Sequence, residues 1–177
     1  MEKWLSRFSG QNLYQLDIHN AAVRPDLLRF RGREALSEPF RWDIEFTTDL
    51  PVKDELLNKF ASLTMRSGKV VHGVITRMEW LSQSADQTHY RIILESRLAL
   101  MKLTCESRIF QNLSAPELAE QLLRQHGFEG PDFDFRLTRE YPARELITQW
   151  QESDLQFLQR ILAEVGIWFR SAMNAVT

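Results

Sequence analysis

The side chains that could act as a nucleophile or a metal ligand are few and widely spaced in this 177-residue chain. The single cysteine, Cys105, has no histidine near it in the sequence, and a catalytic thiol needs a neighbouring base. The histidines occupy unrelated strand and helix-end positions without the close spacing of a zinc-binding pair; they are His19, His72, His89 and His126. We therefore expect no catalytic residue, no metal site and a buried packing role for Cys105.

Glycine motifs that hold phosphate groups are also missing from the sequence. The seven glycines form neither G-x-G-x-x-G nor G-x-x-x-x-G-K, and the G-x-S-x-G nucleophile elbow does not occur. We expect no cofactor and no nucleotide-dependent chemistry.

Two carboxylate pairs, Glu140 with Glu145 and Glu152 with Asp154, could approach to the separation that glycoside hydrolysis requires. However, Glu152 and Asp154 flank Ser153, a predicted helix N-cap, where negative charge stabilises the helix dipole. A structural role is the better interpretation, and peptidoglycan hydrolysis in a phage-tail-like particle is one alternative.

Arginines beside aromatic residues, at 30–33 and 40–42, would suit a small OB-like barrel that binds single-stranded nucleic acid. Against this alternative, the formal net charge is −2, and Asp43 and Glu45 share a strand face with Arg41. We expect no nucleic-acid partner.

The composition is that of a globular chain of one or two small domains, with 44% hydrophobic and 26% charged residues. No segment resembles a secretory signal or a transmembrane span, so we expect no membrane insertion. The cationic residues are 17 arginines and 5 lysines. Arginine suits interfaces and ion-pair networks, although a GC-rich genome would give the same bias.

Most of the first hundred residues predict β-strands. Residues 40–47 alternate strictly, with Phe40, Trp42, Ile44 and Phe46 on one face. Further strands are predicted at 13–19, 27–31, 69–81 and 89–98, the last two forming a hairpin, and a short helix is predicted at 56–60.

Part of that hairpin is apolar on both faces. One face is predicted to carry Val70, Val74, Met78 and Trp80 opposite Tyr90, Ile92 and Leu94, and the other to carry Val71, Ile75 and Ile93. A strand buried on both faces needs a second layer, from the same chain or from another subunit. We expect Val71, Ile75 and Ile93 to face another subunit.

Two helices are predicted in the later part of the chain from capping boxes, Ser114 with Glu117 and Ser153 with Gln156. Strands are predicted at 133–137, 146–150 and 167–170. The fold class is mainly β with α (α+β): a small antiparallel β-barrel over 1–103, a mixed α/β subdomain over 104–170, and a tail at 171–177.

Several segments together resemble one protein family. Residues 30–42, FRGREALSEPFRW, are similar to the opening of VgrG proteins, the spike components of bacterial type VI secretion systems. Further similarity, in the same order, lies at 90–100, at 107–112, and in the RE-Y-x-x-RE…ESD segment from 139 to 167. The resemblance covers residues 10–170.

The resemblance implies a phage-tail-hub-like fold and a structural, non-enzymatic function. In the family, three copies form a ring that stacks on the hexameric Hcp tube, with baseplate components as further partners. It also implies assembly in the bacterial cytoplasm and export on sheath contraction without a signal peptide. The chain is much shorter than family members, so we expect a truncated form that ends before the second barrel, the neck and the needle.

Overall fold

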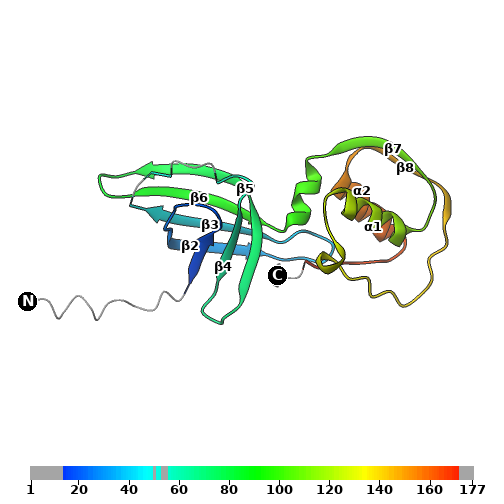
Figure 1. Cartoon of the computed structure of the whole chain (residues 1–177), viewed down its shortest axis with the longest axis horizontal. Helices are drawn as coiled ribbons and strands as arrows, with labels where there is room; N and C mark the ends of the chain where they lie inside the picture. Colours follow the sequence, from blue (N-terminus) through cyan, green and yellow to red (C-terminus); the bar gives the residue numbers. More distant parts are fainter. Residues whose placement is uncertain (1–13, 50, 53–55, 172–177) are drawn as a thin grey trace, which may run out of the picture. The chain divides into compact units, whose positions relative to one another are not determined.

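The computed structural model describes residues 14–49, 51–52 and 56–171, which form two compact units (Figure 1). The first unit contains the residues up to Glu34 and Phe40–Arg97, and the second contains Ala35–Pro39 and Leu98–Ser171. The tail predicted at 171–177 lies outside the described residues except for Ser171. The fold is mainly β with α, in agreement with the predicted class.

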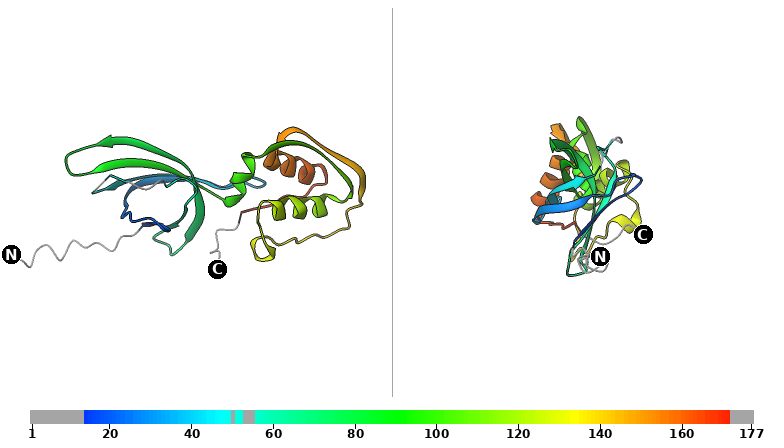
Figure 2. Two further views of the ribbon diagram at one scale, coloured as in Figure 1. Left: turned by 45° about the horizontal axis from the view of Figure 1, so that its top comes forward. Right: turned by 90° about the vertical axis from the view of Figure 1, so that its left-hand side faces the viewer.

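The first unit is one antiparallel sheet of six strands in the order β1-β4-β5-β6-β3-β2. The strands are β1 (Gln15–Ile18), β2 (Asp26–Arg33), β3 (Arg41–Thr48), β4 (Phe60–Thr64), β5 (Val70–Gln83) and β6 (Thr88–Glu95). The sheet curls into an open barrel (Figure 2), which brings its two edge strands near each other. The Tyr14 ring, next to β1, lies 5.1 Å from the Phe30 ring of β2.

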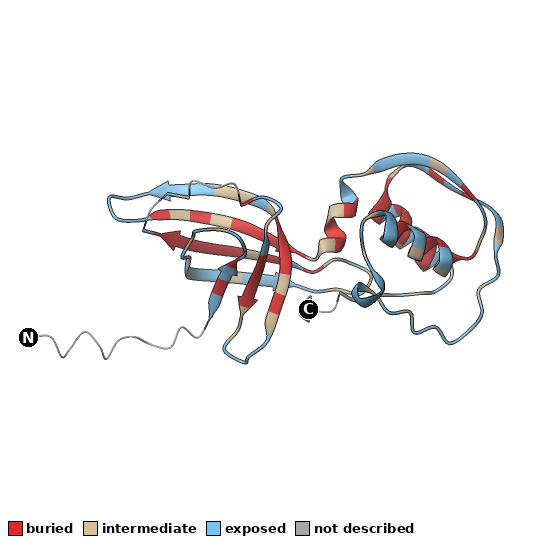
Figure 3. Ribbon diagram, in the orientation of Figure 1, coloured by how far each residue is buried: buried red, intermediate tan, exposed pale blue. Residues whose placement is uncertain are grey.

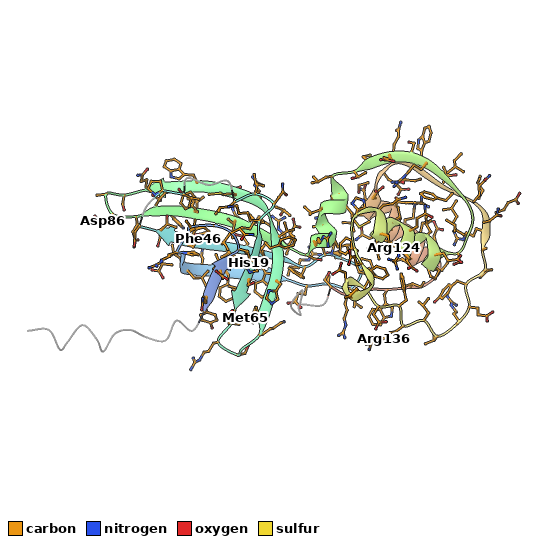
Figure 4. The ribbon with its side chains drawn as sticks, in the orientation of Figure 1. His19, Phe46, Met65, Asp86, Arg124 and Arg136 are labelled. Atoms are coloured by element: carbon orange, nitrogen blue, oxygen red, sulfur yellow. The ribbon has the colours of Figure 1, made fainter. Side chains whose placement is uncertain are left out.

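The concave face of this sheet forms the core, as the alternation in β3 predicts. Ile44 and Phe46 are fully buried, and the Phe46 ring stacks on Tyr90 with the ring centroids 5.8 Å apart (Figure 4). The Trp42 ring packs directly over Gly32, where a Cβ would lie 2.5 Å from ring atoms. Glycine at this position therefore makes room for the indole.

A β-bulge in β5 corrects the predicted facing of the hairpin. The register runs from Ile75 opposite Leu94 to Arg77 opposite Ile93, so one extra residue is inserted in β5. The insertion reverses the alternation, because each residue added to a strand turns the following side chains to the opposite face. As a result Val71, Ile75 and Met78 share the core side, and the predicted grouping of Val74 with Met78 is wrong.

The second unit packs two helices against a two-stranded antiparallel ribbon. Its elements are the 3-10 helix η2 (Arg97–Lys102), β7 (Cys105–Leu113), α1 (Ala115–Gln125), the 3-10 helix η3 (Gly130–Asp132), β8 (Arg144–Ser153) and α2 (Asp154–Glu164). Both predicted capping boxes are confirmed, with Ser114 capping α1 and Ser153 capping α2. The inward faces of both helices are buried (Figure 3).

Four other predictions are wrong. Asn58 lies in a turn with φ 63° and Phe60 begins β4, so residues 56–60 are not a helix. Residues 133–137 and 167–170 are not strands, although Phe133, Phe135, Ile167 and Phe169 pack against the core of this unit. Their apolar side chains anchor extended segments that have no strand ladder. Cys105, which was predicted to be buried, is instead exposed at the start of β7. This strand was itself not predicted.

Candidate assembly surface

Val71, Ile75 and Ile93, predicted to face another subunit, lie inside the barrel unit with 0%, 0% and 2% of their surface exposed. Val71 and Ile75 belong to the core, and Ile93 lies on the other face, in register between Asp43 and Arg77. A side chain without exposed area offers nothing to a second subunit, so these are core residues. For Val71 and Ile75, the second layer comes from the curled sheet itself.

The outer face of the barrel carries a ladder of alternating charges across four strands. Arg29 on β2, Glu45 on β3, Arg91 on β6 and Glu79 on β5 occupy one row of the register. Arg29 pairs with Glu45, and Nη1 of Arg91 lies 3.7 Å from Oε2 of Glu79. Positive and negative charges are thus neutralised within the sheet, as the arginine-rich composition suggested.

Arg91 also binds Asp43, which lies two residues from Glu45 along β3: the Arg91 Nε donates to Asp43 Oδ1 at 2.8 Å. The hydrogen bond from Arg91 holds the pKa of the Asp43 carboxyl below its usual value. The hydrogen bond from Arg29 likewise lowers the pKa of Glu45. Both carboxylates are therefore charged at neutral pH and already paired.

The aromatic residues proposed for nucleic-acid stacking are not available. Phe40 and Trp42 are 3% and 8% exposed, and Phe30 packs against the core. Base stacking needs an exposed aromatic face. These three aromatic residues therefore offer no face to a nucleotide base.

The structure brings together two histidines that are far apart in the sequence. His19 Nε2 and His72 Nδ1 lie 3.0 and 2.8 Å from the Ser62 hydroxyl, across β1, β4 and β5. Asp17 lies 3.8 Å from the same Nε2 that faces Ser62, whereas in a catalytic triad the carboxylate binds the other ring nitrogen. The cluster links three strands, and only the strand register could have revealed it.

Two of the four carboxylates of the hydrolase alternative, Glu152 and Asp154, are each bound to an arginine. Arg160 Nη2 donates to Glu152 Oε1 at 2.5 Å, and Arg108 pairs with Asp154. Glu140 and Glu145 are exposed. A glycosidase needs one acid held protonated by a raised pKa, whereas the pKa of Asp154 is lowered.

Asp154 is the centre of a buried polar network beneath the ribbon. Its carboxylate is 1% exposed and accepts from Gln149 Nε2 at 2.8 Å, while His126 Nε2 lies 2.7 Å from the other oxygen. Burial raises the pKa of Asp154, but the hydrogen bonds from Gln149 and His126 and the charge of Arg108 outweigh it, so the pKa is lowered. The network joins β7, α1, β8 and α2 around one negative charge.

The outer face of the ribbon, opposite this network, is apolar and exposed. Ile109, Leu146 and Trp150 are 65%, 54% and 69% exposed. They point away from α1 and α2, whereas Phe110 and Ile147 on the other face are buried. The sequence did not predict this surface, because its pattern does not identify β7 as a strand.

Among residues 14–49, 51–52 and 56–171, no group of three or more His, Cys, Asp or Glu side chains could hold a metal ion. No helix in the described part of the chain is long and apolar enough to cross a membrane.

Known proteins resemble this chain both in sequence and in fold. The type VI secretion system spike protein VgrG5 of Pseudomonas aeruginosa is 40% identical over 172 residues, which cover 94% of this chain and 22% of that protein. The E. coli c3393 protein, described as a type VI secretion component structurally similar to phage T4 tail proteins gp27 and gp5, is 41% identical with a TM-score of 0.87. That match covers 90% of this chain and 45% of the c3393 chain.

A tail protein from Neisseria meningitidis shares the fold, with a TM-score of 0.58 at 12% identity over 89% of this chain and 50% of that chain. This chain spans about a fifth of the length of its curated VgrG relatives. The model of the phage tail baseplate hub (GPD) matches residues 33–175. The chain therefore belongs to the phage tail baseplate hub family and resembles the hub region of VgrG spike proteins.

Proposed function

We propose that this chain is a structural component of a type VI secretion spike, in the hub that connects the spike to the tube. The similarity to the c3393 protein in both sequence and fold carries the proposal. The paired state of Glu152 and Asp154 supports a structural role over an enzymatic one.

In this role the hub subunits would form a homotrimeric ring that caps the hexameric Hcp tube and contacts baseplate components. The ring would assemble in the bacterial cytoplasm and leave the cell on sheath contraction. The charged outer face of the barrel suits a surface that faces water or a polar partner, because its ion pairs are complete without further ligands.

The test is light scattering of the purified chain mixed with Hcp hexamer, with each protein alone as the control. We expect co-elution of the two proteins, and a mass of three chains per hexamer would support the ring. Separate elution at concentrations up to about 100 μM, a weak affinity for a specific assembly contact, would overturn the Hcp contact.

A further inference from the structure

One end of the outer face of the barrel carries three arginines on two neighbouring strands. Arg33 on β2 lies directly opposite Arg41 on β3, and Arg31 lies two residues before Arg33 on the same face of β2. All three residues are exposed. Like charges directly opposite each other across two strands are destabilising, so the sheet itself does not gain from this pairing. We call Arg31, Arg33 and Arg41 the arginine cluster.

The carboxylate that lies opposite Arg31 is already bound to another arginine. Asp43 is the cross-strand partner of Arg31, but its two oxygens accept from Nε and Nη2 of Arg91. Within the part of the chain that the structure describes, the Arg31 guanidinium makes no ion pair and no hydrogen bond. Its charge is therefore open to water or to a partner.

The carboxylate that lies opposite Arg41 is also engaged on its inner side. Glu95 on β6 approaches Arg41, with 3.8 Å between Glu95 Oε1 and Arg41 Nη1. Its side chain is only 8% exposed, and its Oε2 accepts from the Thr76 hydroxyl at 2.6 Å. Two engaged carboxylates thus border three arginines. The arginine cluster carries a surplus of positive charge, unlike the alternating ladder on the same face.

We propose that the arginine cluster binds the carboxylates of an acidic segment of a partner protein. A guanidinium is a planar fork that holds a carboxylate by two parallel hydrogen bonds, and it loses its weak hydration more readily than an ammonium does. Side chains two residues apart on a strand are separated by about 7 Å, and alternate side chains of any extended segment have the same spacing. An extended segment with acidic side chains at alternate positions therefore reaches Arg31 and Arg33 together.

The charges on the rest of this face favour a short acidic segment over a nucleic acid. Asp43, Glu45 and Glu79 lie on the same face within the next two rows of the register. A nucleic acid, with a phosphate at every nucleotide, would extend over these carboxylates, whereas a short segment occupies only the arginine cluster. The proposal goes beyond the ring and the Hcp contact, because it assigns a ligand chemistry to one part of the barrel surface.

The first test is the binding of a fluorescent peptide of alternating Glu and Thr, measured by anisotropy in about 0.05 M NaCl. Arg31→Glu should raise its dissociation constant about 10-fold, because a repulsion replaces an attraction. Arg24→Glu is the matched control, since Arg24 is also exposed and precedes β2, whereas the arginine cluster lies where β2 ends. The control should leave the affinity nearly unchanged, and a peptide with Gln in place of Glu should not bind.

The second test locates the contact on the unaltered chain and so does not depend on a variant that folds. On addition of the same peptide, the backbone amide NMR signals of residues 31–33 and of Arg41 should shift. The signal of Arg24 should stay in place.

No binding at peptide concentrations up to about 1 mM, an equal loss of affinity in Arg31→Glu and Arg24→Glu, or signals that shift only outside the arginine cluster would overturn the proposal. Tighter binding of an oligothymidylate of equal charge would also overturn it, in favour of a nucleic acid. None of these results bears on Hcp binding. A failure to bind Hcp likewise leaves peptide binding unaffected, so the two proposals fail separately.

Discussion

The barrel unit and the ribbon unit place charge on opposite sides of their sheets. In the barrel, arginines and carboxylates pair on the outer face, over an apolar interior. In the ribbon unit, the outer face exposes the apolar side chains of Ile109, Leu146 and Trp150, and the carboxylate of Asp154 is buried on the side of the helices. The barrel follows the usual rule for a surface that meets water, and the ribbon reverses it.

This difference separates two kinds of ion pair. Pairs that stay partly in water contribute little to stability, whereas a buried carboxylate depends on every partner that replaces its hydration. The two outer surfaces differ as well. A ladder of paired charges is stable in water, whereas burial of exposed apolar side chains against another surface is favourable. The expected effects of mutations differ accordingly between the two units.

The largest expected effect is that of Asp154→Ala. It removes the buried charge that Arg108, Gln149 and His126 share, so each of these groups loses a partner beneath the ribbon, at a cost of about 3–5 kcal/mol. Urea denaturation followed by circular dichroism measures the loss. Asp134→Ala, which breaks the exposed pair of Asp134 with Arg136, is the control and should leave the unfolding free energy nearly unchanged. Equal losses in the two variants would contradict the distinction.

In the barrel, the sensitive position is instead in the interior. Gly32→Ala places a methyl group 2.5 Å from the Trp42 ring, which is 8% exposed and has little room to move. Overpacking of this kind costs about 1–3 kcal/mol. The control is Gly130→Ala, since a Cβ there meets nothing within 4 Å. A stable Gly32→Ala protein would show that the indole can shift at little cost.

Regular patterns could be read from the sequence, and irregular ones could not. The strict alternation of residues 40–47 predicted β3, and the two capping boxes predicted both helices, because each of these signals is local. The sequence did not predict β7, because only Phe110 is buried among its nine residues and its hydrophobic pattern therefore does not alternate. The bulge in β5 could not be read from the sequence, and it made the predicted facing of Val71 and Ile75 wrong. The extra residue turns the side chains that follow it to the opposite face of the strand.

The candidate surface was less predictable than the fold. The sequence predicted a structural role for Asp154 at the start of a helix, but it gave no sign of Arg108, its partner in the structure, which lies 46 residues earlier in the sequence. The exposed outer face of the ribbon forms only when β7 and β8 pair in register. No local spacing in the sequence relates Ile109 to Thr148, its partner across the strands. Pairing across strands, rather than residue type, determines both features.

Acid should destabilise the ribbon unit through Asp154. Because the folded-state pKa of this carboxyl lies below its unfolded value, its contribution is fully present above about pH 4 and is lost as the pH falls through the folded value. The free energy of unfolding should therefore fall with decreasing pH below about 4. Asp154→Asn should be less stable at neutral pH and should show a shallower decline in acid. An unchanged slope would mean that other carboxylates, such as Glu117 and Glu164, cause the decline.

The smallest expected effect is that of Asp43→Asn on the barrel ladder. The Asp43 and Arg91 side chains are 30% and 39% exposed, so water already screens their attraction, and the melting temperature should fall by about 3 °C or less. Thermal melts in about 0.05 M and 1 M NaCl measure the difference, which should nearly vanish at high salt, where the Debye length is about 3 Å. Asp154→Asn provides the contrast, because salt does not reach a side chain that is 1% exposed and its loss should persist. If the Asp43→Asn effect were equally large and insensitive to salt, the ladder would be part of a buried network, and the two units would not differ in how they use charge.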